Sequence, residues 1–414
     1  MPLSFIRHAA TAALLAAITF APAIQAKSSA KSQPMMFIPI TWSVLAEPVY
    51  SVEGTDGVYH LSYEVQLSNT FGGAFVIDSV EVLDARTRQP TGNNRVLAQD
   101  GPEVSGKLVR LAQPVNANGD EFSDIFTNRL PLGETGMMYF DLTYPTRKAI
   151  PKRLVHRFTG HFEDGSQDGQ SFTAEDGGIA VSGQPAIRVH PPLEGKGWID
   201  ANGAGPIISY HRDDTAPTNG VLHPMERYAI DFMKLNDQGM GTSGDPNLVE
   251  SYYGYGQRVL SATPGRVVSV LNDQLDQTPN DLKPPKQFED YSGNHVIVAI
   301  GGGKYAAYAH LKPGSVAVHK GQRVRTGQLL GLLGNSGNTD GPHLHFQIMD
   351  TPDFFNTTSL PFVFDRMIYH GHVPGSFDSG NNAVSTGTAE IIDTTGAGRR
   401  INQMPLSMDV VEFP

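Results

Sequence analysis

The chain reads GNSGNTDGPHLHF from Gly334 to Phe346. Glycine, asparagine and aspartate in the first part favour a loop, because they tolerate backbone conformations that most residues avoid. The last part alternates, with Leu344 and Phe346 on one parity and His343 and His345 on the other. Residues two apart share a face of a strand, so we expect the apolar pair in the core and both imidazoles facing one cleft. Taken alone, a His-x-His pair is best interpreted as two surface histidines. Whether this pair has a functional role depends on the remaining chain.

Length and composition indicate an ordinary globular protein rich in β-structure. With 414 residues, of which 39% are hydrophobic and 18% charged, the chain can bury a large core and more than one domain is expected. The 44 glycines and 29 prolines indicate many turns. The formal net charge of -11 argues against a nucleic-acid partner, because binding phosphate needs a basic face.

Residues 1–26 have the pattern of a secretory signal peptide. Arg7 and His8 precede an apolar run over residues 9–21, and Ala26 ends a plausible cleavage site. The run is short for a bilayer span and no later run approaches its length, so no membrane span is expected once the signal is removed. The alternative is an uncleaved anchor. The absence of cysteine excludes disulfides and a lipidated cysteine. We therefore expect a periplasmic or extracellular protein.

The pattern along the chain predicts an all-β fold. Short alternating segments such as residues 58–67 and 76–82 are separated by glycine, asparagine and aspartate, and no long helical period interrupts them. After residue 375 the composition turns to serine, glycine, asparagine and threonine, and the last residues are either strands that pack back or a mobile tail. The predicted segments are a signal peptide (1–26), a flexible leader (27–36), an N-terminal β-sandwich-like domain (37–189), a connector (190–206), a second, antiparallel β domain (207–375), and a linker with a C-terminal extension (376–414).

Polar residues inside apolar strands of the second domain are candidates for chemistry, because burying them is costly unless they are used. Asp231 lies in the apolar run 228–233, and His310 lies in 304–311. Together with His343 and His345 they offer a carboxylate and imidazoles, which are typical ligands of Zn²⁺. A catalytic zinc takes three protein ligands and a water whose pKa it lowers to about 7, while a nearby imidazole accepts the proton.

Several segments of the second domain occur in the order and at the spacing of a known family: 256–259, 264–268, 293–296, 308–311, 324–328 and 334–346. Through them the chain resembles the lysostaphin/LytM-type zinc metallopeptidases, which cleave peptidoglycan peptides. The resemblance implies an antiparallel β metallopeptidase domain with its zinc in a groove. It also implies that Asp231 and His345 are zinc ligands, and that His310 and His343 flank the reacting carbonyl and the water.

The first ligand of that family departs from its pattern here. The family places it in His-x-x-x-Asp, and the corresponding residue of this chain is Arg227, four residues before Asp231. Arginine stays protonated and offers no lone pair to a metal. The region resembles a sub-branch in which a His-Arg pair precedes Arg-aromatic-Ala-Ile-Asp, which favours His211 as the third ligand. His223 is the alternative, and a site in which neither binds also stays open.

Arg227 has two interpretations of its own. It could lie beside the groove and hold a substrate carboxylate or a developing oxyanion. It could instead pair with Glu226, with Asp231 or with another nearby acid. The sequence leaves both open.

The leading functional hypothesis is a secreted zinc metalloendopeptidase that hydrolyses amide bonds in peptidoglycan peptides through a zinc-activated water. The alternative is a catalytically inactive binding module that activates other cell-wall hydrolases. Inactive members of such a family lose the His-x-His pair or the aspartate, whereas this chain keeps Asp231, His310, His343 and His345. This retention favours the enzyme.

Overall fold

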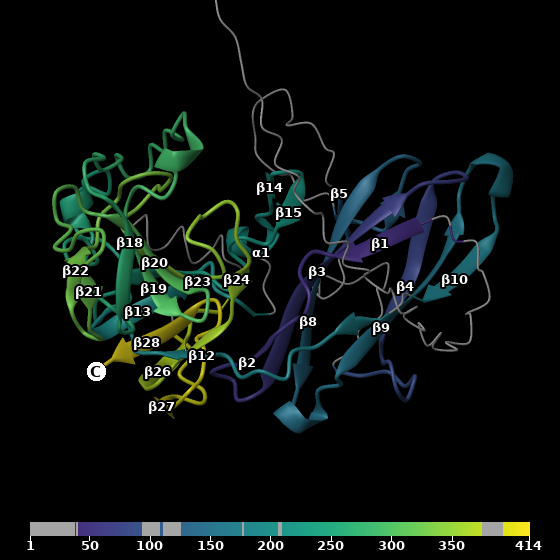
Figure 1. Cartoon of the computed structure of the whole chain (residues 1–414), viewed down its shortest axis with the longest axis horizontal. Coiled ribbons are helices and arrows are strands. Elements are labelled where there is room, and N and C mark those ends of the chain that lie inside the picture. Colours follow the sequence, from purple (N-terminus) through teal and green to yellow (C-terminus); the bar gives the residue numbers. More distant parts are fainter. Residues whose placement is uncertain are drawn as a thin grey trace, which may run out of the picture. The chain divides into compact units, whose positions relative to one another are not determined.

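Nearly all regular structure in the chain is antiparallel β-sheet, which confirms the all-β prediction (Figure 1). The computed structural model describes residues 38, 40–92, 108–110, 126–175, 178–205, 209–374 and 392–414. The predicted signal peptide (1–26) and leader (27–36) lie outside the described residues, as does most of the predicted linker after residue 375. Among the described residues, no helix has the length and apolar character needed to cross a membrane.

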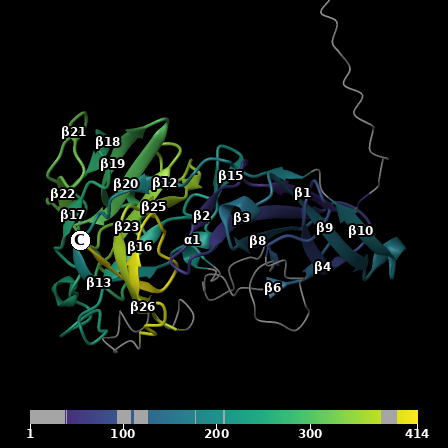
Figure 2. The same ribbon diagram turned by 90° about the horizontal axis from the view of Figure 1, so that it is seen from below.

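Two antiparallel sheets form the N-terminal part of the fold, and Figures 1 and 2 show their strands side by side. The first sheet has the order β1-β3-β8-β5-β6, with β2 on β3: β1 (Ile40–Val44), β2 (Ser51–Glu53), β3 (Tyr59–Asn69), β5 (Leu108–Arg110), β6 (Phe126–Thr127) and β8 (Thr135–Tyr144). The second has the order β10-β9-β4-β7, with β11 on β9: β4 (Phe75–Asp84), β7 (Arg129–Leu130), β9 (Arg153–Phe162), β10 (Ser171–Glu175) and β11 (Ile179–Ala180).

These two sheets share one apolar core, as expected of a sandwich. Leu61, Tyr63 and Val65 of β3 belong to the same buried cluster as Phe75 of β4 and Phe158 of β9. Full burial of such a side chain contributes about 1.5–3 kcal/mol. Because the side chains of a strand alternate between faces, the other face of β3 carries residues such as Ser62 and Glu64, and these too are buried.

An eleven-stranded sheet carries the rest of the fold in the order β21-β18-β19-β20-β23-β16-β13-β28-β26-β27, with β24 on β23. Its strands are β13 (Gly195–Ala201), β16 (Ile230–Lys234), β18 (Gly265–Leu271), β19 (Asn294–Gly301), β20 (Lys304–Leu311), β21 (Arg323–Val324), β23 (Leu344–Met349), β24 (Ser359–Leu360), β26 (Met367–His372), β27 (Gly398–Arg400) and β28 (Asp409–Phe413).

Short elements complete the chain. The remaining strands pair as β12 (Ile187–Val189) with β25 (Phe362–Phe364), β14 (Ala216–Thr218) with β15 (Val221–His223), and β17 (Arg258–Leu260) with β22 (Leu329–Leu332). The helical elements are α1 (Tyr210–Asp213) and the 3-10 turns η1 (Arg147–Ala149), η2 (Gly165–Gln167), η3 (Val249–Ser251) and η4 (Phe288–Asp290).

The C-terminal strand settles a question that the sequence left open. β28 pairs antiparallel with both β13 and β26, so the chain end packs into the large sheet rather than forming a tail. Val411 and Phe413 are buried in the same cluster as Phe346. The residues from Ile38 to Pro414 form one compact unit. The predicted boundaries between domains stay a prediction.

Candidate metal centre

Asp231 and His345 meet because they are direct partners on neighbouring strands. β16 and β23 pair antiparallel with Asp231 opposite His345. Directly opposed side chains on one face lie close enough to interact. Nδ1 of His345 lies 3.1 Å from Oδ1 of Asp231. On the other face, Ile230, Phe232 and Phe346 are fully buried in the core, so the apolar alternation fixes which face carries the polar pair.

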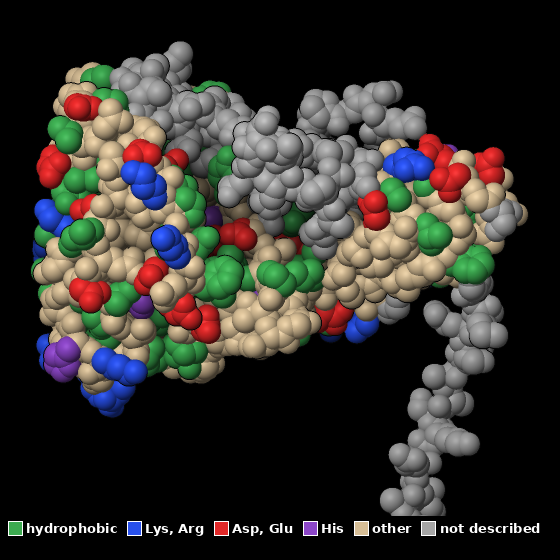
Figure 3. Space-filling view, turned by 90° about the horizontal axis from the view of Figure 1, so that it is seen from above, with side chains coloured by type: hydrophobic (Ala, Val, Ile, Leu, Met, Phe, Trp, Pro, Cys, Tyr) green, Lys and Arg blue, Asp and Glu red, His purple; other side chains and the backbone are tan. Residues whose placement is uncertain are grey.

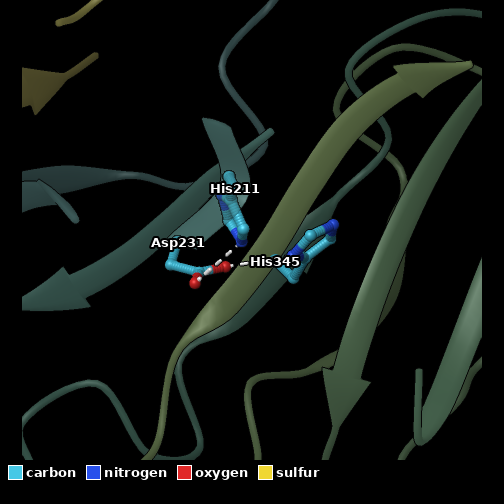
Figure 4. Close-up of side chains that lie close together, drawn as sticks. All are labelled: His211, Asp231 and His345. Atoms are coloured by element: carbon cyan, nitrogen blue, oxygen red, sulfur yellow. Dashed lines mark hydrogen bonds and ion pairs between the residues drawn. The ribbon is translucent and has the colours of Figure 1, made fainter. Parts of the chain in front are cut away.

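His211 reaches the same carboxylate from α1. Its Nδ1 hydrogen bonds to the carbonyl of Ala229 at 3.2 Å, and its Nε2 lies 3.2 Å from Oδ2 of Asp231. One ligand atom from each of His211, Asp231 and His345 lies within 4.8 Å of the others, and all three residues are buried. Figure 4 shows the two imidazoles beside the carboxylate of Asp231. The arrangement forms a possible metal-binding triad.

His223, the alternative third ligand, is placed differently. It ends β15, where it pairs with Ala216 of β14, and its side chain is only partly buried. It is not part of the triad that the described residues form around Asp231. The structure therefore brings His211, and not His223, to Asp231.

His310 and His343 lie next to the triad. Their ring centroids are 4.7 Å apart, and the ring of His310 lies 5.8 Å from that of His345. Nδ1 of His310 bonds to the carbonyl of Ser336 at 2.8 Å, and Nδ1 of His343 bonds to that of Gly341 at 2.8 Å. Each ring is thereby oriented. Nε2 of His310 is left for chemistry, whereas Nε2 of His343 lies 3.3 Å from Oδ1 of Asp231.

His310 has an unusual backbone. Its φ is +59°, in the left-handed region that residues with a Cβ rarely adopt. The residue is the last but one of β20, and its amide donates to the carbonyl of Ser292 at 3.1 Å. Strain of this kind persists where the surroundings impose it, and it is frequent at functional sites.

The electrostatics of the site separate the roles of its groups. Burial would raise the pKa of Asp231, but His211 and His343 hold it well below its ordinary value. Burial would lower the pKa of His211, but Asp231 and Glu226 raise it to about 10. The pKa of His343 is likewise raised by Asp231 against the effect of burial. Burial, followed by the charges of His343 and His345, lowers the pKa of His310 well below its usual value. His310 is therefore neutral at neutral pH.

The donor set fits a zinc ion. Two imidazoles and one carboxylate are ligands that catalytic zinc takes, with a further position left for water. Nε2 of His345 is buried and has no hydrogen-bond partner in the described structure. A buried nitrogen without a partner is costly unless a ligand uses the site.

Two residues at the site were not among the predicted site residues. Oε2 of Glu226 lies 3.7 Å from Nε2 of His211, and its Oε1 lies 3.8 Å from Nε2 of His345. Nδ2 of Asn202 donates to Oδ2 of Asp231 at 2.9 Å. Glu226 could have been noticed as an acid close to Asp231 in the sequence. Asn202 carries no such signal, because only the pairing of β13 with β16 brings it near.

Arg227 does not contact the ligand group in any described interaction. It is 1% exposed, and its guanidinium bonds to Glu64 of β3. Burial would raise the pKa of Glu64, but Arg227 and Arg212 lower it. These contacts agree with the second interpretation of Arg227, in which it pairs with an acid. The acid is Glu64 of the N-terminal sheet. That this arginine marks a sub-branch of a family stays a prediction.

Figure 3 shows acidic side chains (red) and a histidine (purple) in a recess of the described surface, bordered by hydrophobic side chains (green). Phe288 is 69% exposed and its ring lies 5.3 Å from that of Phe355. The ring centroids of Phe354 and His345 lie 6.3 Å apart, so an aromatic side chain lies beside this histidine.

Comparison with known proteins identifies the segment that carries the histidines. Residues 249–357 match the model of Peptidase family M23. The chain is 42% identical over 59 residues to the peptidoglycan DD-endopeptidase ShyA of Vibrio cholerae, a match covering 14% of this chain and 13% of that protein. It is 38% identical over 79 residues to the glycyl-glycine endopeptidase ALE-1 of Staphylococcus capitis, covering 19% of this chain and 21% of that protein.

Among solved structures, the catalytic domain of the antimicrobial peptidase lysostaphin from Staphylococcus simulans aligns with 40% of this chain and 86% of its own length. The identity is 20% and the TM-score is 0.22. The family match includes His310, His343 and His345, and it begins after Asp231 and His211. The segment that matches Peptidase family M23, residues 249–357, therefore includes three of the five residues predicted for the site.

Proposed function

We propose that the chain is a zinc metalloendopeptidase that hydrolyses amide bonds in peptidoglycan peptides. The observation that carries the proposal is the grouping of His211, Asp231 and His345, with His310 and His343 beside it. The match to Peptidase family M23 and the peptidoglycan endopeptidases among its relatives support the substrate class.

In this proposal His211, Asp231 and His345 hold the zinc. Zinc bound there would lower the pKa of a water and polarise the scissile carbonyl. Asn202 keeps the carboxylate of Asp231 oriented through its amide, and Ala229 keeps the ring of His211 oriented through its carbonyl.

His310 and His343 take the proton-handling roles. Because His310 is neutral and its Nδ1 donates to Ser336, its Nε2 can accept a proton from the attacking water. His343 has a raised pKa, its Nδ1 donates to Gly341, and its Nε2 lies 3.3 Å from Oδ1 of Asp231. To donate to the carbonyl oxygen as negative charge develops, this Nε2 would exchange Asp231 for that oxygen.

Secretion is part of the proposal. The signal-like sequence of residues 1–26 would carry the chain across the inner membrane to the periplasm or the outside, where peptidoglycan lies. An inactive binding module is not favoured, because such a module has no use for His310 and His343 beside a complete set of candidate ligands.

The test combines zinc content with digestion of purified peptidoglycan for wild type, His211→Ala, His345→Ala and, as the matched control, His223→Ala. We expect wild type and His223→Ala to bind one zinc and to release peptide fragments that mass spectrometry identifies. The two ligand variants should lose both properties. Wild-type protein that binds no zinc and cuts no peptidoglycan would refute the proposal. Loss of zinc in His223→Ala alone would refute the ligand assignment.

A further inference from the structure

Glu64 lies in the middle of β3 and is fully buried. Its carboxylate accepts hydrogen bonds from two arginines. Oε1 accepts from Nη1 of Arg212, and Oε2 accepts from Nε of Arg227 at 2.9 Å and from Nη2 of Arg227. Arg212 and Arg227 are 3% and 1% exposed. One acid of the N-terminal sheet therefore balances two buried guanidinium groups.

Both arginines are direct chain neighbours of the metal centre. Arg212 follows His211 on α1, and Arg227 follows Glu226, whose carboxylate faces His211 and His345. Arg227 also lies two residues before Ala229, whose carbonyl orients the ring of His211. Glu64 thus contacts two of the segments that carry residues of the site.

The segment that carries His211 has little structure of its own. α1 has four residues, and a helix of that length is unstable without tertiary contacts because few internal hydrogen bonds offset the ordering of its backbone. Its anchors are the hydroxyl of Ser209, which donates to the carbonyl of Asn202 at 3.0 Å, and the side chain of Arg212. Beyond Glu64, Arg212 also donates from Nη2 to the carbonyl of Phe140 at 3.1 Å. The position of His211 therefore depends on β3 and β8.

We propose that Glu64 is a positioning residue of the metal centre, acting through Arg212 on His211 and through Arg227 on the segment before Asp231. The inference rests on the proposed zinc site. It assigns the N-terminal sheet a part in metal affinity, although no residue of that sheet belongs to the ligand group. It also explains an arginine at position 227, because the zinc ligand comes from α1 and residue 227 serves to anchor the loop.

Three variants separate positioning from general stability. Glu64→Gln removes the charge of the one acid that hydrogen bonds to both buried arginines. The triple variant Glu64→Leu/Arg212→Met/Arg227→Met removes all three charges together, a change that buried ion clusters often tolerate without loss of stability. Tyr63→Phe is the matched control, because it removes a buried hydrogen bond from the adjacent residue of β3, 2.7 Å to His156, on the face away from the arginines.

The readouts are the Kd for zinc, measured by competition with a fluorescent chelator, and the Tm of the metal-free protein. We expect Glu64→Gln and the triple variant to raise the Kd by about 10- to 100-fold, as loss of an outer-shell partner does. The triple variant should keep a Tm near that of wild type. Tyr63→Phe should lower the Tm and leave the Kd unchanged.

Two outcomes overturn the inference while the proposed function stands. The first is a wild-type Kd in the folded triple variant. The second is a rise in Kd for Tyr63→Phe as large as that for Glu64→Gln, which would trace the effect to loss of stability. Wild-type protein that binds no zinc would instead overturn the proposed function.

Discussion

Asp141 and Asp231 are both buried and both contact histidine, but their surroundings differ in how fully the side-chain atoms are hydrogen bonded. Asp141 of β8 bonds to His60 at 2.8 Å and to Ser62 at 2.8 Å, and the other nitrogen of His60 lies 3.1 Å from Asp56. Each of these side-chain atoms has a protein partner. At Asp231, three histidines approach one carboxylate, and the buried Nε2 of His345 has no hydrogen-bond partner, with Oε1 of Glu226 3.8 Å away.

The difference separates a structural ion pair from a candidate metal site. A buried charge in a structural pair is stable when its partners are satisfied within the protein. A site with more imidazole nitrogens than the protein can satisfy is arranged for a ligand. The following experiments test that distinction, from the largest expected effect to the smallest.

Replacing the two aspartates should have different consequences. Asp231→Asn removes the charged ligand, so we expect loss of zinc binding and of peptidoglycan cleavage in a protein that still folds. Asp141→Asn should cost about 3–5 kcal/mol of unfolding free energy, because His60 loses its charged partner, and should keep zinc binding. Zinc titration and urea unfolding of both variants measure the two effects. Full zinc binding in Asp231→Asn would remove the distinction.

His310→Asn tests the catalytic role apart from the metal. Asparagine tolerates the left-handed backbone at this position, so the strain at φ +59° should not add to the effect. We expect kcat to fall by about 10²- to 10⁴-fold, as for loss of a general base, while the zinc content stays at one per chain. Single-turnover cleavage of a muropeptide checks the rate. An unchanged kcat would show that another group accepts the proton.

Zinc should stabilise the fold through the Asp231 site alone. A ligand that binds only the native state at 100 times its Kd contributes about 2.7 kcal/mol to the unfolding free energy. We expect a chelator to lower the Tm of wild type and of Asp141→Asn, and to leave the Tm of Asp231→Asn unchanged. Differential scanning calorimetry with and without chelator provides the measurement. A chelator effect of equal size in Asp231→Asn would place zinc elsewhere.

The structural pair should appear in the pH dependence of stability. Burial would lower the pKa of His60, but Asp141 outweighs it and raises the pKa to about 10. Because the folded pKa lies above the unfolded value of 6.5, the stabilisation is complete below about pH 6.5 and is lost as the pH rises toward 10. We expect His60→Gln to cost most near pH 6 and progressively less toward pH 10. Urea unfolding of wild type and variant over this range measures the difference, and a cost independent of pH would contradict it.

Much of the candidate site could be predicted from local sequence. Alternation placed His345 and the apolar Phe346 on opposite faces of one strand, and the polar residues Asp231 and His310 stood out inside apolar strands. Asn202 was missed because nothing in its local sequence distinguishes it from a loop residue, whereas Glu226 could have been noticed as an acid close to Asp231. The order of strands in the large sheet, in which β13 and β28 follow β16, could not be read from periodicity.

The sequence by itself determined the fold class and four polar residues of the site, because strand alternation and the cost of burying polar groups act over a few residues. Only the tertiary structure decided between His211 and His223, and only it supplied a partner for Arg227. These choices depend on Glu64, which lies 148 residues from Arg212 and 163 from Arg227 in the chain. No local pattern encodes a contact at that separation, since it forms only when the sheets bury the three charges together.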